Sequence, residues 1–316
     1  MTRSRPTDPP AADHDPWSGF TGWADAEATE DTRTESAVRR FVRRFSSQRL
    51  AMVALVAIGF LVAVAAFAPW VVPHDPLAQN LSRALEAPSA TYWFGTDAVG
   101  RDTLSRMVFG ARLSLLAAAE AVTVALVLGV VPGLVAGFFG GWVDIVLSRI
   151  TDAVMRIPPL ILAIAIVGVF GPNLRNAMFA VGVIFAPRFL RLTRSAVMAV
   201  REETYIEASR SIGTSTGAVL RRHVLPNILS PLIVQISLSM GFAMLAEASL
   251  SFLGLGVQPP QASWGAMVGT GYRFLDLAPH MVLIPGFAIV LAVLAFNVLG
   301  DGLRDSFGRE ERAADR

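Results

Sequence analysis

Ionisable side chains inside long apolar stretches are the first candidates for chemistry in this sequence. Glu120 and Glu247 each lie in or beside an otherwise uncharged run. A charged group at the centre of a membrane helix costs about 2.5 to 3.5 kcal/mol on insertion scales, so such residues need a partner, a pathway or a route to the surface. Glu247 either lines a pathway or gate or reaches the outer surface. For Glu120, snorkelling or an interhelical hydrogen bond is favoured over transport chemistry.

Composition excludes several other kinds of chemistry. All 27 Lys+Arg residues are Arg, and Cys is absent. The chain therefore lacks the lysine of a nucleotide-binding P-loop or Schiff base, and lacks any thiolate nucleophile or ligand. The four histidines have no metal-ligand spacing, and no serine or threonine has a recognisable base and orienting group. We expect no enzyme activity, no cofactor and no metal site in this chain. A net charge of only +2 gives no indication of nucleic-acid binding.

The elements that must position any such residues are membrane spans. The chain of 316 residues is 53% hydrophobic and only 16% charged, and a span needs about 20 mainly apolar residues. Gaps between charged residues predict six helices, at Leu50 to His74, Leu113 to Val143 (interrupted by Glu120), Ile157 to Leu174, Asn176 to Pro187, His223 to Ala246 and Leu277 to Gly300. The fourth gap is short and must extend past Arg188 to Leu192 to cross the membrane. A further uncharged run, Ala248 to Tyr272, holds five glycines and Pro259-Pro260, so we expect a loop at the membrane surface there.

The arginines predict the orientation of these spans. Arg39, Arg40, Arg43, Arg44 and Arg49 precede the first span with no acid among them. A topology anchor explains this cluster better than specific binding of anionic lipids. Threading six spans from a cytoplasmic N-terminus leaves most remaining arginines inside. Both termini are therefore expected to be cytoplasmic.

The inward-facing stretch Thr193 to Arg222 is too long for a simple turn. Residues 201–212 are compatible with a helix, Gly213 can end it, and Thr214 or Ser215 can cap a second short helix that runs to His223. Small residues (Ala208, Ser209 and Gly213) and apolar side chains (Ile206, Ile212, Val219 and Leu220) on this segment favour a docking surface for another protein. The alternative is an amphipathic helix pair that rests on the membrane.

Three stretches resemble one family of membrane proteins. Glu207-Ala208-Ser209, Gly213 and Leu225-Pro226 have the spacing of the EAA loop of bacterial ABC-importer permeases, although Ser209 and His223 depart from its pattern. The segment with Gly95, Asp97, Arg101 and Asp102 resembles the outer stretch that leads into the second span of these permeases. The run Leu250 to Pro260, with Gly254, Gly256 and Pro259, followed by Ser263-Trp264-Gly265, closely resembles a signature of dipeptide, oligopeptide and nickel permeases.

The resemblance implies an all-α membrane protein with the six transmembrane helices of the type I ABC-importer permease architecture. It would be the C-type permease subunit of a multi-pass importer in the bacterial cytoplasmic (inner) membrane. Residues 1–37 would form a disordered cytoplasmic tail, 38–112 the first membrane span with an external segment, 113–305 the permease core with a cytoplasmic coupling loop at 193–222, and 306–316 a cytoplasmic C-terminal tail.

The resemblance also implies partners and a mechanism. ATP and Mg would bind partner ATPase subunits, and Glu207, Ala208, Ser209, Gly213, His223, Leu225 and Pro226 would couple their hydrolysis to alternating access. A second homologous permease subunit, two ATPase subunits and an extracytoplasmic solute-binding protein would complete the assembly in the lipid bilayer. Glu247 would join the residues of the outer segment and the glycine-rich run in an outer gate or pathway.

Di- or oligopeptides are the expected substrates, and nickel or another small solute is the alternative. A secondary transporter is the less favoured class, because neither paired midplane charges nor an inverted repeat is visible.

Overall fold

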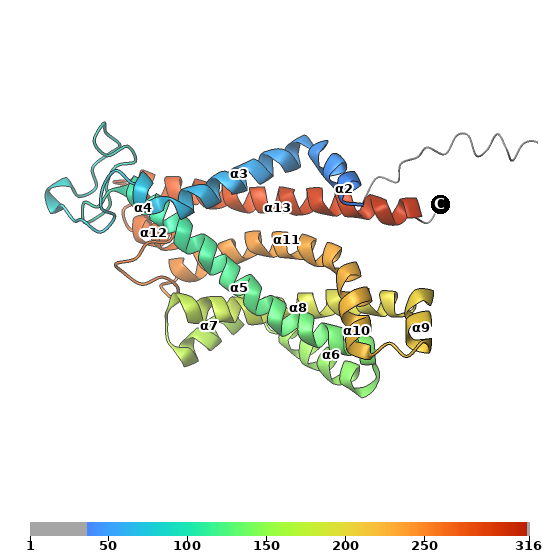
Figure 1. Ribbon diagram of the computed structural model, residues 1–316. Coiled ribbons are helices and arrows are strands. Elements are labelled where there is room, and N and C mark those ends of the chain that lie inside the picture. The colour runs from blue at the N-terminus through green and yellow to red at the C-terminus, as the bar shows by residue number, and fades with distance from the viewer. Residues whose placement is uncertain (1–36, 315–316) are drawn as a thin grey trace, which may run out of the picture. The chain divides into compact units, whose positions relative to one another are not determined.

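The computed structural model describes residues 37–314 and the side chains of residues 38–307. The expected tail, residues 1–37, therefore lies outside the described residues apart from residue 37. The described chain is helical, with one isolated bridge between Thr96 and Asp102. Its elements are shown in Figure 1: α2 (Ala37–Ser46), α3 (Arg49–Ala66), α4 (Ala68–Val71), η2 (Leu81–Arg83), α5 (Thr103–Phe139), α6 (Gly141–Arg156), α7 (Pro159–Phe170), α8 (Leu174–Arg201), α9 (Thr204–Ser211), α10 (Thr216–Val219), the π-helical η3 (Leu220–Val224), α11 (Leu225–Phe252), α12 (Trp264–Tyr272) and α13 (His280–Ala314).

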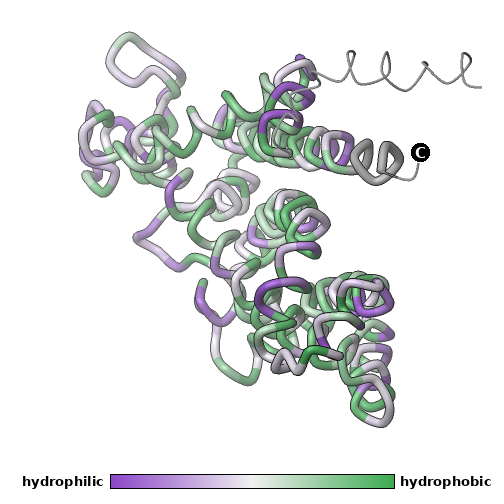
Figure 2. Tube along the Cα trace, turned by 45° about the vertical axis from the view of Figure 1, so that its right-hand side comes forward, coloured by the Kyte–Doolittle hydropathy of each residue, from purple (hydrophilic) through white to green (hydrophobic). Residues whose placement is uncertain are grey.

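Four helices in the described part of the chain are long and apolar enough to cross a membrane: α3, α5, the continuous stretch Thr216–Phe252 and residues 280–307 of α13. The pair α6 and α7 makes a fifth if the two are counted as one bent span. Hydrophobic residues dominate these helices, and hydrophilic ones gather at their ends and connections (Figure 2). The all-α membrane architecture is confirmed, but the count of six unbroken spans is not.

Helix α5 begins and ends at clear local signals. The Asp102 side chain accepts a hydrogen bond from the Ser105 N–H, at 3.0 Å, and so caps the N-terminus. At the other end Gly140 and Gly141 both have positive φ angles, of 65° and 60°, which ordinary side chains disfavour. The helix therefore stops at Phe139, earlier than the Val143 that the sequence predicted.

The third expected span, Ile157 to Leu174, contains a single helix, α7, that is shorter than predicted. Helix α6 occupies residues 141–156, and α7 follows after a bend of 96°. Neither Pro158 nor Pro159 has an N–H to continue the helical hydrogen bonds of α6, which explains the break. With 12 residues, α7 is about 18 Å long, well short of the hydrocarbon core of about 30 Å.

Helices α5 and α8 run parallel and very close together. A Cβ added at Gly133 would lie 2.8 Å from the Leu190 carbonyl oxygen and 2.8 Å from the Thr193 Cβ, and one at Gly137 would lie 2.8 Å from the Arg194 carbonyl oxygen. Later residues of α5 thus meet later residues of α8. Because the two helices point the same way, α6 and α7 together must carry the chain back along their length.

Helix α8 replaces the weak fourth span expected from Asn176 to Leu192. It continues to Arg201 and so takes in part of the predicted inward-facing stretch. It fails as a purely apolar span because its second half contains four arginines, Arg188, Arg191, Arg194 and Arg201. Arg194 forms a two-pronged ion pair with Asp144 of α6, and Arg191 pairs with Asp152 at 2.7 Å.

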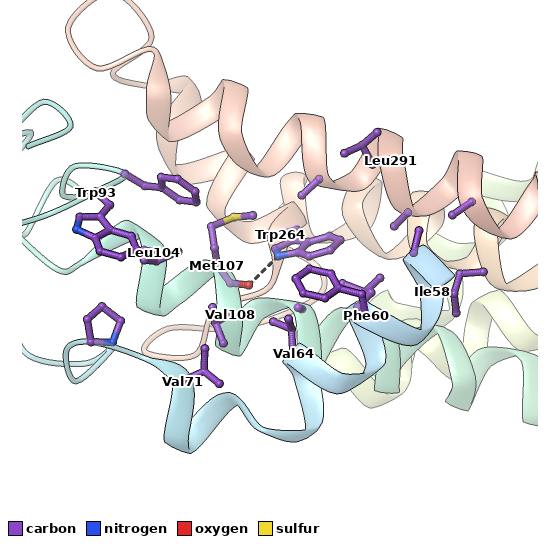
Figure 3. Close-up of a pocket in the computed structure, with 18 residues that line it drawn as sticks. Ile58, Phe60, Val64, Val71, Trp93, Leu104, Met107, Val108, Trp264 and Leu291 are labelled. Atoms are coloured by element: carbon purple, nitrogen blue, oxygen red, sulfur yellow. Dashed lines mark hydrogen bonds between the residues drawn. The ribbon is translucent and has the colours of Figure 1, made fainter. Parts of the chain in front are cut away.

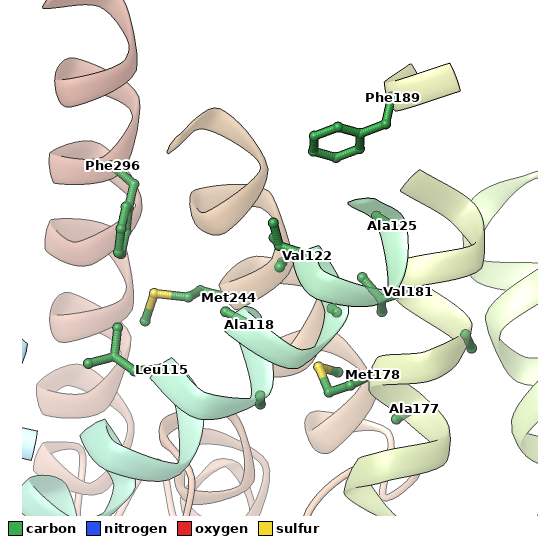
Figure 4. Close-up of a cluster of buried hydrophobic side chains, with 14 of the residues drawn as sticks. Leu115, Ala118, Val122, Ala125, Ala177, Met178, Val181, Phe189, Met244 and Phe296 are labelled. Carbon is green, nitrogen blue, oxygen red and sulfur yellow. The ribbon is translucent and has the colours of Figure 1, made fainter. Parts of the chain in front are cut away.

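The buried core lies between α5, α8, α11 and α13. Figure 4 shows Ala118, Val122 and Ala125 of α5 among Met178 and Val181 of α8, with Met244 and Phe296 contributed by α11 and α13. Many of the α5 residues in this core are alanines. Small side chains let the neighbouring backbones approach closely, which is how helices associate in a membrane where hydrophobic driving force is weak.

The glycine-rich run Ala248 to Tyr272 is only partly the loop that the sequence predicted. Helix α11 continues to Phe252, residues 253–263 form the loop, and α12 begins at Trp264. A Cβ at Gly265 would lie 2.4 Å from the Ala248 Cα, and one at Gly269 would lie 3.1 Å from the Phe252 Cα. These glycines serve close packing of α12 on α11, and therefore do not break the helix.

Gly133→Ala tests the close approach of α5 and α8. In a free helix alanine is more favourable than glycine by about 0.5 to 1 kcal/mol, but here the added methyl group overpacks the contact at a cost of about 1 to 3 kcal/mol. We expect the thermal unfolding midpoint of the purified protein in detergent to fall. Gly168→Ala is the matched control, because a Cβ there meets nothing within 4 Å, and it should leave the midpoint unchanged or raise it. Equal midpoints for the two variants would contradict the contact.

Candidate functional site

Asp97 organises the segment that precedes α5. One of its carboxylate oxygens accepts the backbone N–H groups of Val99, at 3.0 Å, and Arg101, at 2.9 Å. The other accepts the Arg101 Nε–H at 2.6 Å and lies 3.5 Å from the Arg106 Nε. The side chain is almost fully buried. Paired with two guanidinium groups, it fixes a tight turn rather than presenting a free charge.

The same segment is attached to the start of α13 and to α5. Gly95 has φ of 72°, and a Cβ there would lie 2.7 Å from the His280 Nε2. The His280 Nε2 lies 3.4 Å from the Thr96 carbonyl oxygen. Asp102 both caps α5 and lies 3.4 Å from the His74 Nδ1. The predicted gate residues Gly95, Asp97, Arg101 and Asp102 thus form one anchored unit.

Arg106 joins this unit to the glycine-rich loop. Its Nη1 donates to the carbonyl oxygens of Pro76, at 3.3 Å, and Pro260, at 3.4 Å. Residues 95–106, residues 253–264 and Glu247 are called the gate cluster below. The structure therefore brings together the two distant stretches that the sequence assigned to an outer gate.

Trp264 is the second link between α5 and the loop. Its indole N–H donates to the Met107 carbonyl oxygen at 2.9 Å, the dashed contact in Figure 3. Its backbone N–H donates to the Ser114 hydroxyl at 3.3 Å. A Cβ added at Gly110 would lie only 3.1 Å from the Trp264 Cδ1, so the indole packs directly on the α5 backbone.

The loop itself depends on its glycines. Gly254 has φ of 78°, a conformation that side chains rarely adopt. A Cβ at Gly256 would lie 2.2 Å from the Ser251 Oγ, so only glycine leaves that hydroxyl in place. Pro259 lies at the exposed tip, where Pro260 turns its carbonyl toward Arg106.

Glu247 lies beneath the loop and does not reach the surface. Only 1% of the residue is exposed. The Ser251 hydroxyl donates to its Oε1 at 2.7 Å and the Ser114 hydroxyl to its Oε2 at 3.2 Å. Of the two alternatives for Glu247, the structure contradicts the one in which it reaches the outer surface. Glu120 is partly exposed on α5 and outside the gate cluster.

An apolar cavity of about 660 Å³ adjoins the gate cluster between α3, α5 and α13. Phe60, Val64, Leu104, Met107 and Trp264 are among the side chains that face it in Figure 3. The described lining is aliphatic or aromatic, and the Trp264 indole N–H is already bonded to Met107. The cavity can accept hydrocarbon, but it offers a polar solute little to bind.

The predicted coupling residues lie at the opposite end of α5 (Figure 1). Residues 202–227 are called the coupling segment below. Helix α9 ends before Gly213, whose φ is 81°, and the Thr214 N–H bonds back to the Ser209 carbonyl oxygen at 3.1 Å. The expected helix break is therefore present. The second helix differs from expectation, because α10 continues through the π-helical η3 into α11.

Burial divides the coupling segment into an anchoring face and an open face. Ile206 and Ser209 are buried, whereas Glu207 and Ala208 are exposed and Ile212 is 84% exposed. Nothing lies within 4 Å of a Cβ placed on Gly213. Contrary to the sequence interpretation, Ile206, Ser209 and the buried Val219 hold the segment to the rest of the chain and are not available to a partner.

Helix α9 is attached to both α5 and α11. The α9 contact to α5 is made by the Arg210 guanidinium, which lies 4.6 Å from the Phe138 ring centroid. Just before α9, Arg201 at the end of α8 donates to the Gly137 and Phe138 carbonyl oxygens at the end of α5. Cations at a helix C-terminus are favourable because carbonyl groups there lack partners.

The attachment to α11 passes through Tyr205. Its ring lies 6.0 Å from the His223 ring, and its hydroxyl accepts from the Asn227 side-chain amide at 3.1 Å. Partial burial, and then the nearby Glu203, raise the pKa of the Tyr205 hydroxyl above its ordinary value. His223, one of the departures from the EAA pattern, therefore has a structural partner in α9. Leu225 and Pro226 are exposed at the start of α11.

Several residues of the gate cluster carry no sequence signal for their role. In sequence, Arg106 is far from Pro260, Ser114 is far from Glu247, and Trp264 is far from Met107. Ordinary serines and arginines do not reveal such partners. Residues in the signature around Trp264 were recognised, but its bond to α5 was not. Among the described residues, no group of three or more His, Asp or Glu could hold a metal ion.

Comparison with known proteins identifies the family. Residues 125–312 match the family described as binding-protein-dependent transport system inner membrane component. Residues 36–88 match the N-terminal TM domain of oligopeptide transport permease C.

Curated relatives cover most of the chain. It is 45% identical over 268 residues to the dipeptide transport system permease protein of Alkalihalophilus pseudofirmus, covering 85% of this chain and 88% of that protein. It is 40% identical over 279 residues to the glutathione transport system permease protein of Pectobacterium atrosepticum, covering 87% and 92%.

A solved structure shares the fold. The inward-facing MetNI methionine ABC transporter aligns with a TM-score of 0.52 and 20% sequence identity, over 64% of this chain and 97% of that one.

The family match and the curated relatives show that the chain belongs to the family of inner membrane components of binding-protein-dependent transport systems. Within it, the chain is a C-type permease of the peptide ABC importers, as the sequence resemblance predicted.

Arg106→Met tests whether Arg106 holds the loop to the segment before α5. A hydrogen bond to a charged group contributes about 1.5 to 3 kcal/mol, so even the lower value predicts roughly 10-fold faster amide exchange in residues 256–262. Hydrogen exchange measured by mass spectrometry on the purified protein checks this. Arg112→Met, which removes an exposed arginine from the same helix, should leave the loop unchanged. Equal exchange in both variants would show that the Arg106 contacts do not hold the loop.

Proposed function

We propose that this chain is a transmembrane permease subunit of an ATP-driven importer of peptides, in which the coupling segment transmits the action of separate ATPase subunits to the gate cluster. The observation that carries the proposal is that α9 is attached both to the C-terminal end of α5 and to the start of α11. Helix α5, with 37 residues, is about 55 Å long, and both helices reach the gate cluster. A displacement of α9 would therefore act on the two helices that hold the gate.

The open face of the coupling segment suits a docking partner. Glu207, Ala208 and Gly213 are exposed, and the surrounding side chains include Arg210 and the apolar Ile212. We propose that two ATPase subunits, which bind ATP and Mg, dock here on this chain and on a second homologous permease subunit. This chain supplies no lysine for a P-loop, so nucleotide hydrolysis falls to those partners.

The arginine distribution supports the orientation. Arg201, Arg210, Arg221 and Arg222 lie in or beside the coupling segment, and positive loops favour the cytoplasmic side. We infer a bacterial cytoplasmic membrane protein with cytoplasmic termini, whose gate cluster faces an extracytoplasmic solute-binding protein. The relatives named for dipeptide and glutathione transport support short peptides as the substrate class.

The function is tested with the assembled transporter in proteoliposomes. This chain is combined with the second permease subunit, the two ATPase subunits and the solute-binding protein. Uptake of radiolabelled alanyl-alanine and of glutathione is then measured with and without ATP. We expect ATP-dependent uptake of at least one of the two peptides. Solute movement by this chain alone, driven by an ion gradient and indifferent to ATP, would overturn the proposal.

Glu207→Trp tests coupling through the open face of α9. Disrupting a residue at the centre of an interface costs about 2 kcal/mol or more, so ATPase binding should weaken roughly 30-fold and uptake should fall with it. Membrane insertion should remain, because Glu207 is exposed. Gly213→Trp should act in the same direction.

The control for this experiment is Asp301→Trp, which changes an exposed carboxylate of α13 outside the coupling segment. It should keep both uptake and co-purification of the ATPases. If Glu207→Trp also keeps normal uptake with a normally bound ATPase, the coupling role of this residue is wrong.

A further inference from the structure

Two chains of hydrogen bonds converge on the carboxylate of Glu247. In the first, the Val257 N–H donates to the Ser251 hydroxyl oxygen at 3.2 Å, and the Ser251 hydroxyl donates to the Glu247 Oε1 at 2.7 Å. In the second, the Trp264 N–H donates to the Ser114 hydroxyl oxygen at 3.3 Å, and the Ser114 hydroxyl donates to Oε2 at 3.2 Å. Both chains start at backbone amides on either side of the Pro259-Pro260 turn.

The direction of these hydrogen bonds is fixed by chemistry. A backbone N–H can only donate, so each serine oxygen accepts from the amide and each serine proton must go to Glu247. Both oxygens of Glu247 therefore act as acceptors. An ionised carboxylate satisfies both chains, whereas the side-chain amide of glutamine has one oxygen and an NH₂ group that cannot accept.

The two chains tie together three separate elements. Glu247 and Ser251 belong to α11, Ser114 to α5, and the amides of Val257 and Trp264 to the loop and the start of α12. Ser263, which caps α12, also interacts with the Glu247 carboxylate. With 1% of the residue exposed, the carboxylate can bind only to these neighbours and not to bulk water.

Glycines make room for this arrangement. The Ser251 hydroxyl occupies the space that a Gly256 side chain would need, with only 2.2 Å between the Oγ and an added Cβ. The α12 backbone approaches α11 at Gly265, where a Cβ would lie 2.4 Å from the Ala248 Cα. The loop therefore fits against α11 closely enough for short polar side chains to reach Glu247.

We propose that Glu247 is a positioning residue for transport: it makes the glycine-rich loop move as one body with α5 and α11, so that the gate cluster follows the coupling segment. This rests on the proposed function. Glu247 is 22 residues along α11 from Leu225, or about 33 Å from the coupling segment. It does not touch ATP or the docking surface, so it acts on the outer end of the same two helices.

Glu247→Gln, in the assembled transporter, tests the proposal with two measurements. The first is the amount of alanyl-alanine or glutathione taken up per ATP hydrolysed. The second is the rate at which a membrane-impermeant maleimide labels a single Gln261→Cys. This label is possible because the natural chain has no cysteine, and Gln261 is exposed in the loop.

The expected result is loss of coupling without loss of the complex. Uptake per ATP should fall about 10-fold, and Gln261→Cys should react about 10-fold faster, because one buried hydroxyl is left without an acceptor. Ser114→Ala removes only the hydrogen bonds that connect Glu247 to Trp264 through α5, and it should give the same pattern. ATP hydrolysis should persist in both variants.

Two controls match the chemistry of these changes. Glu120→Gln neutralises a carboxylate of α5 outside the gate cluster. Ser237→Ala removes a buried serine of α11 that bonds to the Phe296 carbonyl oxygen instead. Both should keep the natural uptake per ATP and labelling rate.

Two outcomes would overturn the proposal. The first is Glu247→Gln behaving like Glu120→Gln in both measurements. The second is uptake, ATP hydrolysis and the yield of folded complex falling in parallel, which would make Glu247 a structural residue only. The labelling rate needs no transport, so it still reports on the loop if the unmodified assembly imports neither peptide and the proposed function fails.

Discussion

Close contact between helix backbones is the constraint on which the rest of this structure depends. In a membrane, lipid tails compete with apolar side chains, so helices associate through fit and not through exclusion of water. Gly133 and Gly137 bring α5 against α8, and the alanines of α5 bring it against its other neighbours. Once α5 is fixed in this way, its two ends have fixed positions. One end meets the coupling segment and the other meets the gate cluster.

The polar interactions are concentrated at those two ends. Arg210 attaches the C-terminal end of α5 to the coupling segment, and Arg201 attaches it to the end of α8. Arg106 and Ser114 attach the first turns of α5 to the glycine-rich loop and to Glu247. Helix α11 has the same arrangement, with Asn227 near one end and Glu247 near the other. Between the ends the buried side chains are mainly apolar, although the Ser237 hydroxyl of α11 donates to the Phe296 carbonyl oxygen of α13. We propose that these two helices carry a displacement of the coupling segment to the gate cluster.

Much of this could be predicted from the sequence, and the failures have physical causes. Uncharged runs located α3, α5, α11 and α13, because apolar length is what a span requires. The same counting missed the break before α7, since Pro158 and Pro159 are uncharged but remove backbone donors. It also read Gly265 and Gly269 as loop residues, although their packing against α11 keeps them helical. The motifs predicted a functional role for the segments that lie at the two ends of α5. They could not show that Ser114 reaches Glu247, because 133 residues separate the two and only the packing of α5 on α11 joins them.

The bend between α6 and α7 has a consequence for how this chain can sit in a bilayer. Pro159 has no N–H, so the carbonyl oxygen of Met155 is deprived of its helical donor, and hydrocarbon offers no replacement. An unsatisfied backbone group facing lipid tails costs several kcal/mol. Irregular backbone at that depth is tolerated only against other protein or beside water. If the bend lies at hydrocarbon depth, we therefore expect a neighbouring subunit or a water-filled passage to cover the backbone beside Ile157.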